Sequence, residues 1–166
     1  MKTNPKVLMA SIFLAATLII NTSYTGEVYD YIPVFMERSE LEKSVSYQTT
    51  GRDLTQPGKI HYKAPYIYIN EKYKGVHIID NTNPQNPVNT AFIVAPGCID
   101  MAVKGSIIYL DNAVDLVAFD MNTKQVTGRV KNVFPEPTAP DNRYYNIWNR
   151  PDGFILVGWK KNSLKN

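Results

Sequence analysis

The stretches that decide the fold of this chain are YIYIN at residues 66–70 and VHIID at residues 76–80. Both recur, as IIYLD at residues 107–111 and LVAFD at residues 116–120, so that position 66 aligns with 107 and position 76 with 116. A period near forty that is filled with short strand-like runs is typical of blade-type β repeats. The repeat therefore predicts an all-β architecture. It does not predict a chemistry, because folds of this kind host many unrelated functions.

Each copy of the repeat contains four runs that favour strands, separated by residues that favour turns. In the first unit, residues 58–95, they are Lys59–Lys63, Tyr66–Asn70, Gly75–Asp80 and Asn89–Val94; in the second unit, residues 98–132, they are Ile99–Lys104, Ser106–Asp111, Asp115–Asp120 and Val126–Lys131. The central strands are apolar on both faces, since Ile67 and Ile69 alternate with Tyr66 and Tyr68. This pattern is typical of a sheet packed between neighbouring sheets, as in a propeller blade.

A partial third unit is expected at residues 144–159. There Tyr144–Trp148 and Phe154–Trp159 flank Asp152-Gly153, a pair that favours a hairpin turn. Over residues 58–166 the sequence thus predicts an incomplete β-propeller-like stack of about two and a half four-stranded antiparallel blades. Such a stack leaves an apolar face open at each end, so we expect the protein to self-associate or to dock onto an envelope protein.

The N-terminal residues carry a different pattern. Lys2 and Lys6 precede an apolar run at residues 7–20, which favours a signal peptide at residues 1–25. The run is shorter than the roughly 20 residues of a membrane-spanning helix, although a retained anchor is the alternative. We therefore expect an exported protein in the periplasm, the outer membrane or the cell surface, with membrane contact only through this leader.

Residues 26–57 form an N-terminal segment without the repeat. Within it, Ser39 and Glu42 match the S-x-x-E capping box, in which the two side chains satisfy each other's backbone amides. The sequence therefore predicts a short N-terminal helix at residues 40–44, capped by Ser39.

Charge and cysteine content exclude some function classes. Without the two leader lysines, the 18 basic residues fall to 16 against 15 acidic ones, a net charge of +1. No run of Lys or Arg interleaved with aromatic residues remains, so we expect no nucleic-acid binding. The single cysteine, Cys98, rules out an internal disulfide and is expected to be a buried apolar residue.

With these motifs in view, the chain resembles the bacterial LVIVD-repeat proteins. The resemblance rests on Gly75–Asp80 followed by Asn83–Pro87, and on Pro57–Ile60 and Asp100–Gly105. It covers residues 31–159 and implies an exported, often lipid-anchored β-propeller protein without a catalytic motif. This chain resembles the N-terminal part of such a propeller. The zone in which family members commonly carry the lipid-bearing cysteine holds Asn21–Ser23 here.

Candidate binding residues occur at equivalent strand ends. Asn70 and Glu71 follow the second strand of the first unit, and Asp111 and Asn112 follow its counterpart in the second unit. We expect these four residues to line one rim, because binding surfaces on rigid scaffolds are commonly built from such loops. Ordinary turn formation is the alternative interpretation.

Other polar residues are expected to be structural. Asp80 and Asp120 each precede a turn and can accept hydrogen bonds from backbone amides two or three residues on, while Pro84 and Pro87 belong to the turn after Asp80. Calcium ligation by the aspartates is the alternative, although no D-x-[DN]-x-[DN]-G loop occurs. His61 and His77 are replaced by Ala102 and Val117 in the second unit, so structural or partly exposed histidines are expected, and a metal or proton-transfer role is the alternative.

These observations predict a non-enzymatic, exported repeat module that binds a protein or ligand in the cell envelope. No catalytic residues, cofactor or metal ligands are predicted, because no G-x-S-x-G, H-E-x-x-H, paired C-x-x-C or glycine-rich phosphate loop occurs. The alternatives are a hydrolase or metal-dependent enzyme on a propeller scaffold, marked by titratable residues that converge at one rim, and a truncated copy of a longer propeller protein.

Overall fold

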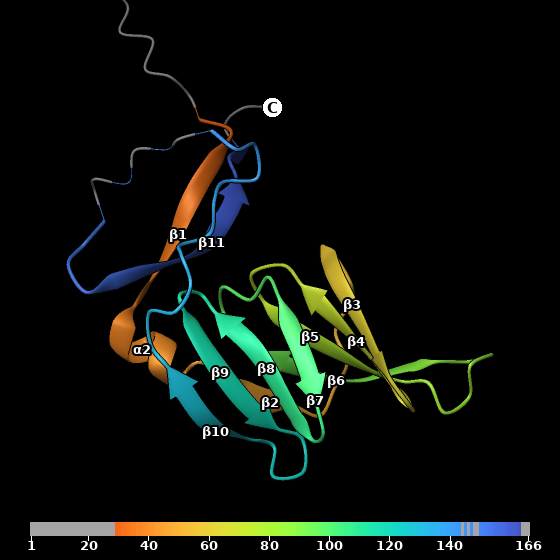
Figure 1. Cartoon of the computed structure of the whole chain (residues 1–166). Coiled ribbons are helices and arrows are strands. Elements are labelled where there is room, and N and C mark those ends of the chain that lie inside the picture. Colours follow the sequence, from red (N-terminus) through yellow and green to blue (C-terminus); the bar gives the residue numbers. More distant parts are fainter. Residues whose placement is uncertain (1–28, 144, 146, 148–149, 164–166) are drawn as a thin grey trace, which may run out of the picture.

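The computed structural model describes residues 29–143, 145, 147 and 150–163, and these form an all-β fold with one short helix (Figure 1). The strands lie in three antiparallel sheets, and within the described residues none of these sheets closes on itself. The prediction of an all-β protein is confirmed. The signal peptide predicted at residues 1–25 lies outside the described residues.

The first sheet is built from the first unit. Its strands are β3 (Pro57–Lys63), β4 (Tyr66–Glu71), β5 (Gly75–Asp80) and β6 (Val88–Val94), with the short β2 (Ser46–Gln48) added beyond β6. The four strands expected from the sequence are confirmed. The fifth strand was not predicted, because the three residues of β2 are too few to show an alternating pattern.

The second sheet is built from the second unit. It contains β7 (Met101–Lys104), β8 (Ile107–Asn112), β9 (Asp115–Asp120) and β10 (Gln125–Val130), in the order β10-β9-β8-β7. The main shift from the expected boundaries is at β7, which begins at Met101 and not at Ile99. The backbone amides of Ile99 and Asp100 donate to the Asp111 carboxylate and not to a neighbouring strand.

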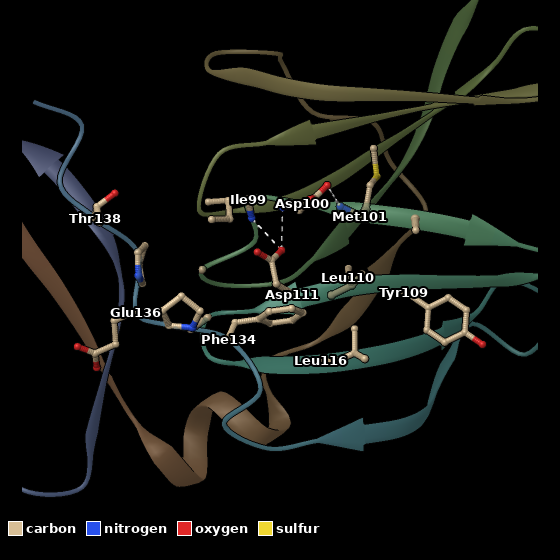
Figure 2. Close-up of a pocket in the computed structure, with 15 residues that line it drawn as sticks. Ile99, Asp100, Met101, Tyr109, Leu110, Asp111, Leu116, Phe134, Glu136 and Thr138 are labelled. Atoms are coloured by element: carbon tan, nitrogen blue, oxygen red, sulfur yellow. Dashed lines mark hydrogen bonds between the residues drawn. The ribbon is translucent and has the colours of Figure 1, made fainter. Parts of the chain in front are cut away.

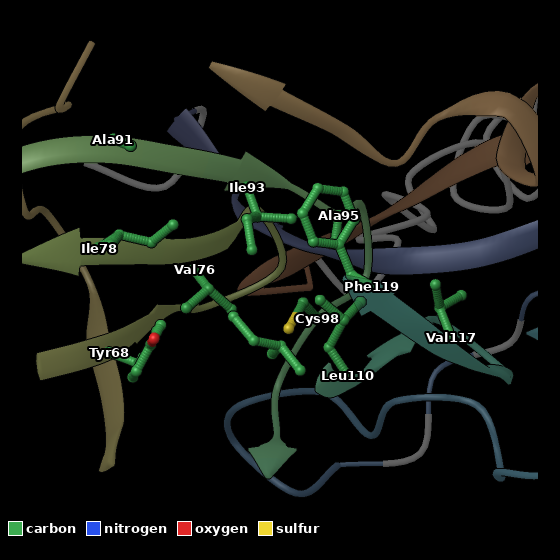
Figure 3. Close-up of a cluster of buried hydrophobic side chains, with 11 residues drawn as sticks. Tyr68, Val76, Ile78, Ala91, Ile93, Ala95, Cys98, Leu110, Val117 and Phe119 are labelled. Atoms are coloured by element: carbon green, nitrogen blue, oxygen red, sulfur yellow. The ribbon is translucent and has the colours of Figure 1, made fainter. Parts of the chain in front are cut away.

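The two sheets pack face to face around one apolar core (Figure 3). The side chains that fill it come from both sheets and from the connection between them: Tyr68, Val76, Ile78, Ala91, Ile93, Ala95, Cys98, Ile108, Leu110, Val117 and Phe119. Repeat counterparts do not meet in this core. Tyr68 is 5% exposed inside it, whereas its counterpart Tyr109 is 38% exposed on the opposite side of the second sheet. The two units are therefore stacked head to tail.

The third sheet joins the two ends of the described chain. It pairs β1 (Tyr31–Glu37) with β11 (Phe154–Lys161), and it lies at one end of the two stacked sheets (Figure 1). The sequence predicts that Phe154–Trp159 forms a hairpin with residues 144–148. Among the described residues this prediction is wrong, because Phe154–Trp159 pairs with β1. Residues 144, 146 and 148 of that hairpin lie outside the described residues.

The short helix α2 (Arg38–Lys43) connects β1 to the stacked sheets. The helix predicted at residues 40–44 exists, but its predicted capping box is wrong: Glu37 occupies the N-cap position and makes no side-chain cap, and the Ser39 hydroxyl donates to the Glu37 carboxylate over 2.8 Å. Glu42 does not reach back, because it pairs with Arg38 at 3.0 Å and with Lys131 at 2.6 Å. Cation pairing outcompetes the capping geometry here.

Candidate functional site

The four candidate rim residues lie inside the protein and do not form an open rim. Their exposed fractions are 1% for Asn70, 2% for Glu71, 7% for Asp111 and 0% for Asn112. Each stands at the end of β4 or β8 and reaches backbone groups of the adjoining loops. Buried backbone amides and carbonyls require hydrogen-bond partners, and these side chains supply them. We expected these four residues to be exposed, because the sequence shows the strand ends but not the loops that fold over them.

Glu71 is the centre of a buried hydrogen-bond network in the first unit. Its carboxylate accepts the backbone amides of Thr55 at 3.1 Å and Gln56 at 2.7 Å and also the Thr55 hydroxyl, and His77 Nε2 lies 3.2 Å away. Burial alone would raise the pKa of Glu71, but the hydrogen bonds from Thr55, Gln56 and His77 outweigh it and lower the pKa to about 2. The network fixes the loop that leads into β3.

His77 is fully buried beneath this network. Its ring packs edge-on against Phe92, with 4.8 Å between the ring centroids, and the Asn89 side-chain amide lies 3.4 Å from its Nδ1 atom. Its surroundings therefore give His77 a structural role, one of the two interpretations that the sequence allowed. The other histidine, His61, is half-buried in β3.

Asn70 connects the first unit to the link between the sheets. Its side-chain amide donates to the carbonyl oxygens of Gly75 and Cys98, both at 3.2 Å, and lies 3.3 Å from the Cys98 sulfur. Cys98 is buried in the shared core, as predicted, and burial raises the pKa of its thiol well above the ordinary value. The thiol is thus held protonated and away from solvent.

Asp111 takes the corresponding position in the second unit, at the inner wall of a cavity. One carboxylate oxygen accepts the backbone amides of Ile99 and Asp100, both at 2.9 Å (Figure 2). Burial raises the pKa of Asp111, and the two amide hydrogen bonds oppose that rise without overcoming it.

Two further polar residues anchor the second unit, and the sequence singled out only the first. The side-chain amide of Asn112 donates to the Pro96 carbonyl at 2.7 Å. Asp115, which is fully buried, pairs with Arg38 of α2 at 2.9 Å and with Arg129 of β10 at 2.7 Å. Burial raises the pKa of Asp115, but the hydrogen bonds from the Asn132 amide and the two arginines lower it by more. The pKa of Asp115 is therefore below its usual value. The sequence holds one signal for the group formed by Asp115 and the two arginines: Asp115 is acidic, whereas the aligned residue of the first unit is Gly75.

The predicted turn residues have the roles expected of them. Asp80 accepts the backbone amide of Thr82 at 2.8 Å, and Asp120 accepts that of Asn122 at 2.9 Å. Pro84 and Pro87 lie on the exposed turn between β5 and β6. These aspartates shape turns in the same way in both units.

A half-open cavity of about 440 Å³ lies on the side of the second sheet that faces away from the first. Its walls are mostly apolar and include Ala102, Tyr109 and Leu116 from the sheet and Phe134 and Pro135 from the segment after β10 (Figure 2). Asp111 is the buried carboxylate in its wall. A cavity with this lining suits apolar side chains or an apolar ligand.

Both sheets also carry apolar side chains on their outer sides. The outward face of the first sheet includes the apolar residues Ile60, Tyr62, Ile67, Ile69 and Ile79, with Ile60 67% and Tyr62 61% exposed. The outward face of the second sheet consists of Tyr109, Leu116, Ala118, Gly128 and Val130, with Val130 57% exposed. Contiguous exposed apolar side chains of this kind mark interaction surfaces.

The described part of the chain contains neither a membrane-spanning helix nor a cluster of candidate metal ligands. None of its helices has the length and apolar character needed to cross a membrane. Among the same residues no three His, Cys, Asp or Glu side chains gather in a way that could hold a metal ion.

Comparison with known proteins adds no relative to this picture: the chain matches no family model, no curated protein and no solved structure.

Proposed function

We propose that this chain is an exported, non-enzymatic binding module of the β-propeller-like type, which holds a protein partner through its open sheet faces. Its resemblance to the LVIVD-repeat proteins, taken from the repeat motifs, is part of this proposal. Export is supported by the lysines and the apolar run at residues 2–20.

The observation that carries the proposal is the head-to-tail stack with two apolar outer sides. In a propeller each blade is covered on both faces by its neighbours. Here Ile60, Tyr62 and Val130 keep more than half of their surface exposed, on edge strands of the two sheets whose other sides pack around the shared core. Apolar surface of this kind gains free energy of roughly 25 cal/mol per Å² when a partner covers it. The polar candidates at the strand ends are engaged in internal hydrogen bonds, which leaves the sheet faces as the accessible feature.

Site-specific photo-crosslinking in the producing cell tests the binding function. A photoreactive amino acid at Tyr62 or Val130 is expected to yield a defined protein adduct, because each position lies in an outward face. The matched control is Val88, which is 51% exposed at the start of β6 but belongs to neither face. Failure of both Tyr62 and Val130 to form adducts above the Val88 level would contradict the proposal.

Export has its own test. N-terminal sequencing of protein from the cell envelope is expected to find a first residue between Ser23 and Glu27, as the leader pattern predicts. An intact Met1 on cytoplasmic material would contradict this part of the proposal and leave the binding surfaces unaffected.

A further inference from the structure

We propose that the partner of the two outward faces is a second copy of this chain, docked so that the outward face of one first sheet covers the outward face of another second sheet. This inference rests on the proposed function, because it names the occupant of the open faces. The contact between copies would repeat the contact that already exists between the two units within one chain.

The strand register relates one outward face to an inward one. On the inward face of the first sheet, one row across β4, β5 and β6 is Tyr68, Ile78 and Ala91, and the next row is Val76 and Ile93. On the outward face of the second sheet, the equivalent rows across β8, β9 and β10 are Tyr109, Ala118 and Gly128, and then Leu116 and Val130. The outward face of the second sheet is therefore a second version of the surface that packs against a neighbouring unit.

The same correspondence holds for the complementary surface. On the inward face of the second sheet, the rows across β7, β8 and β9 are Met101, Leu110 and Val117, and then Val103, Ile108 and Phe119. On the outward face of the first sheet, the equivalent rows across β3, β4 and β5 are Ile60, Ile69 and His77, and then Tyr62, Ile67 and Ile79. Each chain thus carries a second copy of each half of its own internal interface on its outward faces, and only His77 of the rows on the first sheet is fully buried.

The cavity points independently to the same contact. In the internal stack, Ile108 and Leu110 share a core with Ala95 and Cys98, which belong to the segment that follows β6. Phe134 and Pro135 belong to the segment that follows β10, and they border the cavity of about 440 Å³ together with Tyr109 and Leu116. Cys98 follows Ile93 at the same spacing as Pro135 follows Val130. The cavity therefore lies where Ile67 and Ile69 of a following copy would insert.

The outward face of the first sheet leaves room for this contact. The Arg52 guanidinium lies 4.4 Å from the Phe92 ring centroid and covers the β6 side of the first sheet. The β3 side stays open, with Ile60 and Tyr62 largely exposed. Because the two docking surfaces differ, the contact is heterologous and propagates into a row or closes into a ring.

Sedimentation velocity of the chain purified from the producing cell, with its N-terminus read by mass spectrometry, tests the inference. Wild-type protein is expected to form species larger than a dimer as its concentration rises from micromolar to millimolar. Tyr62→Asp and Val130→Asp are each expected to raise the concentration needed by roughly tenfold or more, because each buries a carboxylate in the contact. Val88→Asp is the control and is expected to match the wild type. Circular dichroism melts check that all three variants stay folded.

A mixing experiment separates this geometry from every self-complementary dimer. The Tyr62→Asp chain keeps the outward face of its second sheet intact, and the Val130→Asp chain keeps the outward face of its first sheet intact. Each is therefore expected to be monomeric alone, whereas an equimolar mixture forms a heterodimer and stops there. A monomeric wild type, or association that survives both substitutions, would overturn the inference. Photo-crosslinks from Tyr62 to a different protein alone would also overturn it, while the proposed binding function would stand.

Discussion

Glu71 in the first unit and Asp111 in the second both accept hydrogen bonds from a loop, but their pKa values shift in opposite directions. Each accepts two consecutive backbone amides from the loop that precedes the first strand of its unit, at 2.7 to 3.1 Å. Yet the pKa of Glu71 is lowered to about 2, whereas that of Asp111 is raised. The difference lies in the remaining partners, because Glu71 also receives the Thr55 hydroxyl and faces His77.

Both units thus have the same strands and both need a side chain that accepts the loop amides, but the residue that accepts them differs. By alignment Asp111 corresponds to Asn70, so the second unit uses the neighbouring strand position for the same task. The second unit places its strongly paired acid at Asp115, where the arginine of α2 and the arginine of β10 meet. Each unit is fastened to a different part of the N-terminal segment, the first to residues 55–56 and the second to α2.

The largest expected effect on stability comes from a core position of the first unit whose counterpart in the second unit lies outside the core. Ile78→Asp is expected to unfold the protein, because Ile78 is 2% exposed and an unpaired buried carboxylate costs several kcal/mol against a stability of roughly 5 to 15 kcal/mol. Its counterpart Ala118 is only half-buried on the outward face, so Ala118→Asp is expected to cost about 1 kcal/mol or less. Thermal melts followed by circular dichroism measure both. Equal losses would show that the two faces are assigned wrongly.

The second effect removes the anchor that only the second unit has. Asp115→Ala is expected to lower the free energy of unfolding by about 3 to 5 kcal/mol, because it leaves Arg38 and Arg129 without their buried partner. Asp120→Ala, on the same strand, removes only a turn hydrogen bond and is expected to cost about 1 kcal/mol. Urea denaturation of the two variants checks the ranking, which a larger loss for Asp120→Ala would reverse.

The third effect sharpens the contrast between the two carboxylates through pH. The folded pKa of Glu71 is about 2 and its ordinary value is 4.5, so its stabilisation is complete above pH 4.5 and is lost as the pH falls toward 2. At 1.36 kcal/mol per pKa unit this amounts to about 3 kcal/mol. Urea unfolding at pH 7, 5 and 3 is expected to show that Glu71→Gln is less stable at pH 7 and has lost this part of the acid sensitivity. An unchanged pH profile would contradict the assignment.

The smallest effect is expected at the other carboxylate. Because the pKa of Asp111 is raised, its ionised form is disfavoured in the folded state, and the folded protein gains stability as that carboxyl takes up a proton. Asp111→Asn keeps an oxygen for the Ile99 and Asp100 amides and is expected to change stability by less than about 1 kcal/mol, in the stabilising direction at pH 7. The gain is expected to shrink as the pH is lowered. Chemical denaturation at pH 7 and 4 measures it, and a clear loss of stability at pH 7 would refute this balance.

The strands of the two units were predictable because their signals are local. Alternation along residues 66–70 and 76–80, and the turn formers between Asp80 and Val88, place β4, β5 and β6 without knowledge of the rest of the chain. Asp80 and Asp120 were predictable for the same reason, since a turn aspartate acts on an amide two residues away.

What could not be predicted depends on partners far apart in the sequence. The pairing of β1 with β11 and the approach of Arg38 to Asp115 leave no local periodicity to read. The candidate rim residues show the same limit, because the identity of Glu71 gives no sign that the Thr55 loop folds over it. Sequence position indicated the right strand ends there, but tertiary contacts decided that those ends are buried.

The pairing of β1 with β11 also sets an order of events in synthesis. Glu37 faces Phe154, so the ribosome makes both repeat units after β1 and before the partner of β1 exists. At translation rates of about 5 to 20 residues per second, the nascent chain carries β1 unpaired for roughly 6 to 25 seconds. The two stacked sheets, by contrast, contain only neighbours in sequence apart from β2, and they can assemble while the ribosome is still working. The two stacked sheets can therefore form before β1 and β11 pair.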